Sequence, residues 1–282
     1  MIVASGMPNW ILDFLGSGGM FGKADGIWGW CMTIVTLLMG QNPSDISPEA
    51  WSYITDTVYP WFLTVGVTLL NLFFMVGFLR QSTNLRENLP LEVFVEQIIK
   101  VIIANILMLN SITLIRDFIS GAGLLAGNIM VTSYPTIFGS EVDAGAVLAY
   151  VLFGVIYILV SAVCGIVILI EVLARFLNLF LLTAFAPVAF STLAGGRGIE
   201  SSAYSWIRSF LNTTFQIVVI ALIIRIGSLM IRSNVISAGT LPFGESWFDG
   251  FQDVLLSMVT MIFMATAVKT SDVFLKRALD LR

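Results

Sequence analysis

The 282-residue sequence contains no histidine. Histidine is the commonest general base, a usual zinc ligand and the base of Ser-His and Cys-His pairs, so its absence removes these forms of catalysis together. The two cysteines, Cys31 and Cys164, stand far apart in apolar surroundings and form no CxxC motif. The Gly-rich stretch GSGGMFGKADG lacks the Lys-Ser/Thr ending of a phosphate-binding loop. We therefore expect no catalytic residues, no cofactor and no bound metal.

Charge is also scarce. Charged residues make up 11% of the chain and hydrophobic residues 57%, and the mean hydropathy is +0.93. A net charge of -4 has the wrong sign for a surface that holds nucleic acid by its phosphates. Residues 58–79, 147–170 and 176–196 each run for roughly 20 residues without a charge, which is the length that crosses a bilayer. The composition therefore predicts an integral membrane protein surrounded by membrane lipids.

Because hydrocarbon offers the backbone no hydrogen-bond partners, apolar runs of this length predict an all-α fold, here a polytopic helical membrane bundle. We expect about five full spans, at residues 58–79, 91–115, 147–170, 206–231 and 251–268. Residues 176–196 contain Pro187 and form either a Pro-broken re-entrant segment or an additional span. The apolar run 27–39 is too short to span alone and predicts a short N-terminal interfacial helix.

The basic residues suggest an orientation, because Lys and Arg gather in cytoplasmic loops near span ends. If residues 176–196 form a re-entrant segment, the basic clusters all lie on the cytoplasmic side of the membrane: Arg80, Arg86, a turn at Glu171 to Arg175 and the basic tail. A full crossing would put the tail outside, against that tendency. The chain then divides into an N-terminal interfacial and extracytoplasmic segment (1–57), a membrane helical domain (58–268) and a cytoplasmic amphipathic tail (269–282).

Ionisable residues inside apolar helices are candidate functional positions. Glu96 and Lys100, spaced i,i+4, indicate either a polar passage or a mutually satisfied pair that other helices shield from lipid. Glu171 and Arg175 repeat this spacing in the better orientation for an ion pair. Arg225 interrupts the fourth expected span, where its guanidinium either serves function or reaches the headgroups from about two turns inside the helix end.

Small residues and proline mark candidate packing positions. Gly123 and Gly127 have GxxxG spacing, which permits close helix contact within one chain or between copies in an oligomer. Pro187 either breaks its helix where a bend is needed or is simply tolerated there.

From residue 147 to residue 231 the order of features is distinctive. A long apolar helix leads through EVLARFLNLFLLTAFAPVAFSTLAGGRG to YSWIRSFLNTTFQIVVIALIIRI: a helix end near a Pro, small residues, an Arg, then a Trp that opens the next span. In this order and texture the segment resembles the TrbL-type family, the polytopic inner-membrane subunit of conjugative type IV secretion systems. The matching positions are Pro187, Gly195, Arg197 and Trp206.

The resemblance implies a multi-pass protein of the bacterial cytoplasmic (inner) membrane that assembles with its own copies and with other type IV secretion subunits. Such a subunit forms part of a translocation channel or its membrane scaffold, and meets the translocated DNA-protein substrate only in transit. The chain departs from the family in its short external segments, which puts contacts with outer components in doubt. The alternative is a small-solute or ion transporter or channel, which would show an internal repeat with broken helices in both halves. We see one broken segment and no clear repeat.

Overall fold

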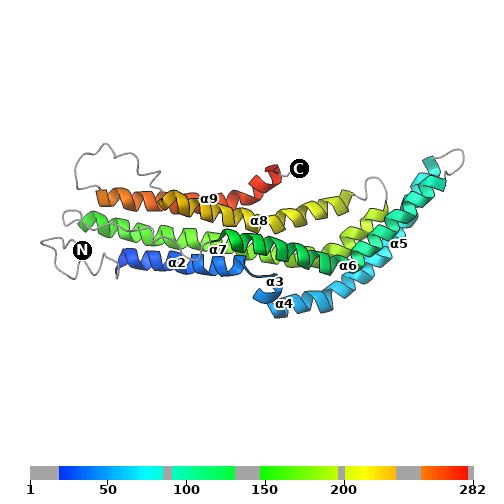
Figure 1. Ribbon diagram of the computed structural model, residues 1–282, viewed down its shortest axis with the longest axis horizontal. Helices are drawn as coiled ribbons and strands as arrows, with labels where there is room; N and C mark the ends of the chain where they lie inside the picture. The colour runs from blue at the N-terminus through cyan, green and yellow to red at the C-terminus, as the bar shows by residue number, and fades with distance from the viewer. Residues whose placement is uncertain (1–18, 85–90, 131–146, 196–200, 233–248, 279–282) are drawn as a thin grey trace. The chain divides into compact units, whose positions relative to one another are not determined.

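The computed structural model describes residues 19–84, 91–130, 147–195, 201–232 and 249–278, which contain helices and no strand (Figure 1). In chain order the elements are α2 (Met20–Met39), α3 (Pro43–Ile46), α4 (Pro48–Ser52), the π-helix η1 (Tyr53–Val58), α5 (Tyr59–Asn84), α6 (Leu91–Ile129), α7 (Val147–Ser191), the 3-10 turn η3 (Thr192–Gly195), α8 (Ser201–Arg232) and α9 (Asp249–Ala278). The predicted all-α class is confirmed.

Within these residues, five stretches are long and apolar enough to cross a membrane. They are Pro48–Leu79, Phe94–Ile129, Phe153–Gly195, Ser201–Leu229 and Leu255–Ala278. A helix satisfies all of its main-chain groups internally, which is the condition for crossing hydrocarbon. The chain is therefore a multi-pass membrane protein, as its composition predicted. The N-terminal α2 is not among the five, in agreement with its expected non-spanning role.

The largest departure from expectation is α7, a single helix of 45 residues with Pro187 inside it. The structure shows neither the turn expected at Glu171 to Arg175 nor a helix break at Pro187. Residues 171–175 contain no Gly or Pro that would end a helix, and a proline removes only one main-chain bond. At 1.5 Å per residue, α7 is about 67 Å long, roughly twice the hydrocarbon thickness of a bilayer.

Two expected segment boundaries also fall inside helices. The C-terminal part of the expected segment 1–57 is largely helical as α3, α4 and η1, so the boundary at 57/58 lies within a continuous helical stretch. The change from π to α hydrogen bonding falls just before Pro60, which has no N–H to donate. Helix α9 likewise runs through the boundary at 268/269. In addition, α6 continues to Ile129, beyond the expected span end at residue 115.

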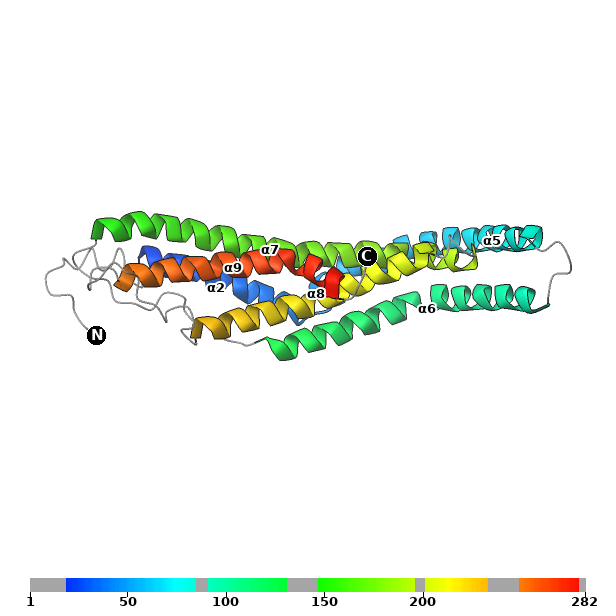
Figure 2. The ribbon, with the colours of Figure 1, turned by 90° about the horizontal axis from the view of Figure 1, so that it is seen from above.

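The chain forms two compact units, and the first consists of residues 19–40, 125–130, 147–173, 217–232 and 249–274. Here α2 packs along the first part of α7, as Figure 1 shows. The rings of Phe21 and Tyr157 lie 5.4 Å apart, and the Ser161 hydroxyl donates to the Ala24 carbonyl at 2.6 Å. The Tyr157 hydroxyl of α7 also donates to Asp25 Oδ1 of α2 at 3.1 Å. Helix α9 runs beside α7 in this unit as well (Figure 2).

The second unit consists of residues 41–84, 91–124, 174–195, 201–216 and 275–278. Its apolar core draws on α5, α6, α7, η3 and α8, with Leu70, Met108, Leu179, Phe190 and Phe210 among its buried members. Two buried glycines on α5 permit the closest helix approach in this core. A Cβ at Gly66 would lie 2.9 Å from the Pro187 carbonyl oxygen, and one at Gly77 would lie 2.9 Å from that of Ala194.

We expect Gly66→Ala to destabilise the protein by about 1–3 kcal/mol, because the new methyl meets backbone that cannot move aside. Gly127→Ala is the matched control, since a Cβ there meets nothing within 4 Å. That control should be neutral or stabilising by up to about 1 kcal/mol through helix propensity. Thermal unfolding of the purified variants in detergent measures both changes. Equal shifts for the two variants would contradict the close contact.

Candidate functional site

Arg175 is a fully buried cation in the interior of α7, with only 2% of its surface exposed. Its Nε donates to the Thr213 carbonyl at 2.9 Å and its Nη2 to the Thr214 carbonyl at 3.5 Å, both on α8. Its guanidinium carbon also lies 5.1 Å from the ring centre of Phe176. The guanidinium is thus held by backbone oxygens and a ring face, and not by Glu171, the partner that the i,i+4 spacing predicted.

The part of α8 that receives Arg175 is polar and buried. Asn212, Thr213, Thr214 and Gln216 are all less than 9% exposed. We call these four residues and Arg175 the polar belt. More than half of the candidate span on α8 is buried, a larger share than in the other four spans of the described chain. The belt therefore lies in protein interior, where polar side chains are costly unless they are paired.

The hydrogen bonding of the polar belt is incomplete within the described chain. Arg175 Nη1 and Thr214 Oγ1 are both buried and have no protein hydrogen-bond partner. No carboxylate neutralises Arg175 among these residues. A guanidinium stays protonated and only donates, so both its charge and part of its donor capacity remain uncompensated. An uncompensated intramembrane charge marks a functional position more often than a structural one.

Pro187 and Trp206, two positions of the TrbL-type resemblance, both lie in the second unit. The Trp206 Nε1 donates to the Leu182 carbonyl at 3.1 Å, in the turn before Pro187. Its ring lies 4.9 Å from that of Phe190 and stacks on Phe210 at 5.4 Å. Trp206 is therefore a packing and hydrogen-bonding residue between α7 and α8. Gly195 lies at the end of η3, and Arg197 lies outside the described residues.

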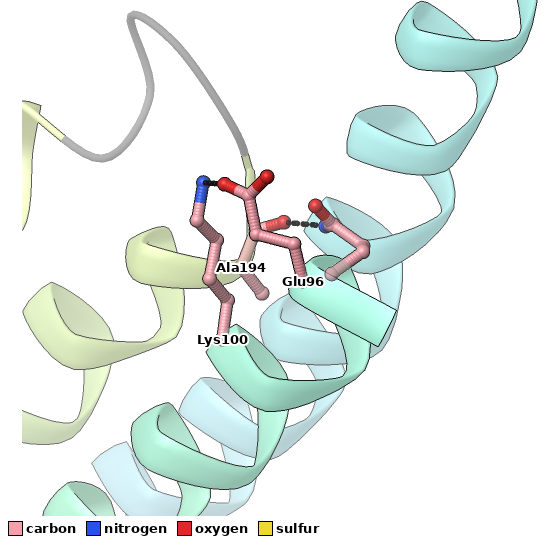
Figure 3. A network of polar contacts seen from close by, with 4 residues as sticks. Glu96, Lys100 and Ala194 are labelled. Carbon is pink, nitrogen blue, oxygen red and sulfur yellow. Dashed lines mark hydrogen bonds and ion pairs between the residues drawn. The ribbon is translucent and has the colours of Figure 1, made fainter. Parts of the chain in front are cut away.

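Glu96 and Lys100 form the predicted ion pair, with Nζ and Oε1 3.0 Å apart (Figure 3). The prediction that other helices shield this pair is not met within one chain, because the Glu96 side chain is 59% exposed and that of Lys100 28%. The pair lies near the start of α6, where charged heads reach a membrane interface. The buried polar residue is instead Gln97, whose Nε2 donates to the Ala194 carbonyl at 2.6 Å (Figure 3).

The remaining predicted positions lie apart from the polar belt. Arg225 is only partly buried on α8, in keeping with a guanidinium that reaches toward headgroups. A Cβ at Gly123 would come no closer than 3.9 Å to another residue, and one at Gly127 would meet nothing within 4 Å. The GxxxG pair therefore makes no close helix contact in the described chain. Close approach to backbone occurs instead at Gly66 and Gly77, which carry no GxxxG signal.

The described residues offer no group of three or more His, Cys, Asp or Glu that could hold a metal ion. Cys31 is a packing residue, because a Cβ at Gly165 would lie 3.0 Å from its Sγ. Burial raises the pKa of the Cys31 thiol, which lowers the thiolate fraction needed for nucleophilic attack.

We expect Trp206→Phe to lower stability by about 0.5–1.5 kcal/mol, since it removes the bond to the Leu182 carbonyl and keeps most of the ring contacts. Trp206→Ala should cost more, about 3 kcal/mol, by removing the ring as well. Trp61→Phe, at a side chain that is 65% exposed, is the control and should change stability by less than about 0.5 kcal/mol. Detergent melts would refute this role for Trp206 if both Phe variants behaved alike.

A search of protein-family models, of curated proteins and of solved structures found no match to this chain. The grounds for its function are therefore its own residues and their geometry.

Proposed function

We propose that this protein is an integral membrane subunit of a conjugative type IV secretion apparatus, located in the bacterial cytoplasmic membrane and assembled with its own copies and other subunits. It contributes to the translocation channel or its scaffold and performs no catalysis. The resemblance of residues 147–231 to the TrbL-type family is the reason for proposing this particular assembly. The exposed apolar surface of α6 supports assembly in general.

The α6 surface is too long for lipid alone to cover. The exposed side chains of Phe94 (42%) and Leu124 (68%) belong to one helix and one compact unit. They are 30 residues apart, which corresponds to about 45 Å along the helix, or about 34 Å across the membrane at a tilt of 40°. The hydrocarbon layer is about 30 Å thick, and the exposed charges of Arg116 and Asp117 interrupt the surface before Leu124, so the Leu124 end of the surface falls outside the hydrocarbon. Protein contact is the favourable cover for apolar side chains in that position.

The contacts between Pro187 and its surroundings add support at the level of residues. Two positions that carry the resemblance, Pro187 and Trp206, both pack in the second unit: the backbone of Pro187 lies against Gly66, and Trp206 bonds to the Leu182 carbonyl of the same helix as Pro187. This packing gives both residue types a structural role in the core, which supports the resemblance on which the proposal rests.

A small-solute or ion transporter is the second candidate, and the polar belt is the observation that favours it. Intramembrane charges facing a bundle interior often mark ion or substrate pathways. If the protein is a transporter, the purified protein in liposomes should move solute or ions by itself. A secretion subunit should show no transport without the rest of its assembly.

Deletion of the gene from its conjugative element should abolish transfer of that element's DNA and leave growth and solute uptake normal. Expression of the wild-type gene in trans should restore transfer. Mating frequency, growth rate and uptake are measured in the same strains. Parental transfer frequency in the deletion strain would reject the secretion function, and a selective uptake defect would favour the transporter.

We also expect the purified protein to run as an oligomer, larger than the 30.9 kDa chain, in mild detergent. Leu124→Ser should shift it toward monomer, because the substitution places a hydroxyl in the apolar contact. Leu72→Ser, at an equally apolar exposed site on α5, is the control and should leave the assembly intact. The mass of the protein in the detergent complex measures its oligomeric state. A monomeric wild-type protein would contradict self-assembly.

A further inference from the structure

The polar belt has the composition of an anion site. Arg175 brings one full positive charge into the interior of the second unit, at 2% exposure. The backbone carbonyls of Thr213 and Thr214 accept hydrogen bonds from its Nε and Nη2. Carbonyl dipoles carry no net charge, so they do not neutralise the guanidinium. Nη1 remains a charged donor without a protein partner, and the hydroxyl of Thr214, the residue whose carbonyl accepts from Nη2, is likewise buried and unpartnered.

The buried charge of the belt and its unpartnered hydrogen-bond donors define which ligand would satisfy it. A water molecule would satisfy hydrogen bonds but would leave the buried charge uncompensated, and a buried charge is stable only when it is paired. The guanidinium N–H and the threonine O–H are both donors suited to an anion. Every residue of the belt is less than 9% exposed and both unpartnered atoms are closed to solvent, so a ligand enclosed with them must be small, which excludes a lipid headgroup or peptide.

We propose that the polar belt binds a small inorganic anion of the size of chloride, held by Arg175 Nη1 and the Thr214 hydroxyl. The anion neutralises the guanidinium and links α7 to α8 through the belt. This assignment is independent of the role in DNA transfer and holds for a channel subunit or a transporter alike.

The experiment is thermal unfolding of the purified full chain in detergent, with sodium chloride exchanged stepwise for sodium gluconate at constant ionic strength. The wild-type Tm should rise with chloride and saturate, because a ligand that binds only the folded state stabilises it. Gluconate is too large to enter and should give no rise. Equal wild-type Tm values across the whole exchange would overturn the proposal.

Three variants locate the effect. Arg175→Gln removes the charge and should abolish the chloride-dependent rise, while Arg225→Gln, at the partly exposed arginine of α8, should keep it. Thr214→Val keeps the side-chain shape without the hydroxyl and should raise the chloride midpoint about tenfold. Thr214→Val carries the test if Arg175→Gln does not fold. A wild-type midpoint in Thr214→Val, or loss of the rise in Arg225→Gln, would show that chloride acts elsewhere and reject the site.

Discussion

The structure depends on hydrogen bonds from side-chain donors to backbone carbonyls of neighbouring helices. The Tyr59 hydroxyl donates to the Met108 carbonyl at 2.6 Å, the Gln97 amide to that of Ala194 at 2.6 Å, and Arg175 to that of Thr213 at 2.9 Å. A helical carbonyl keeps a second lone pair, so it can accept such a bond without losing its own helix partner. In a lipid surrounding, apolar contact gives helices little drive to associate. These directional bonds therefore set the register of α5, α6, α7 and α8 within the second unit.

Close helix approach at Pro187 works together with these bonds. The proline removes one main-chain donor from α7, yet the helix continues to Ser191. Gly66 lets the backbone of α5 come close to this turn, and Trp206 donates to the Leu182 carbonyl just before it. The irregular turn is thus covered by protein on two sides, which is the condition under which membrane helices tolerate proline.

The polar belt and the long apolar surface of α6 are separate features with separate consequences. The surface of α6 concerns what surrounds the protein, because its exposed apolar length exceeds the thickness of hydrocarbon. The belt concerns the interior, where a charged donor lacks a counter-charge among the described residues. The proposed assembly into a secretion apparatus would cover the α6 surface. The proposed anion would neutralise Arg175, whichever assembly contains the protein.

The sequence by itself determined the helical class and the number of long apolar helices, because apolar runs of bilayer length leave the backbone no other structure. It also paired Glu96 with Lys100, since i,i+4 neighbours meet on any helix. The tertiary structure decided that Arg175 turns to α8 and away from Glu171, and that Arg225 is the less buried arginine. It likewise decided that close approach to neighbouring backbone occurs at Gly66 and Gly77, and not at Gly123 and Gly127. The physical reason is that local spacing fixes neighbours along one helix, whereas burial and cross-helix contacts depend on which faces of different helices meet, and a uniformly apolar sequence does not specify those faces.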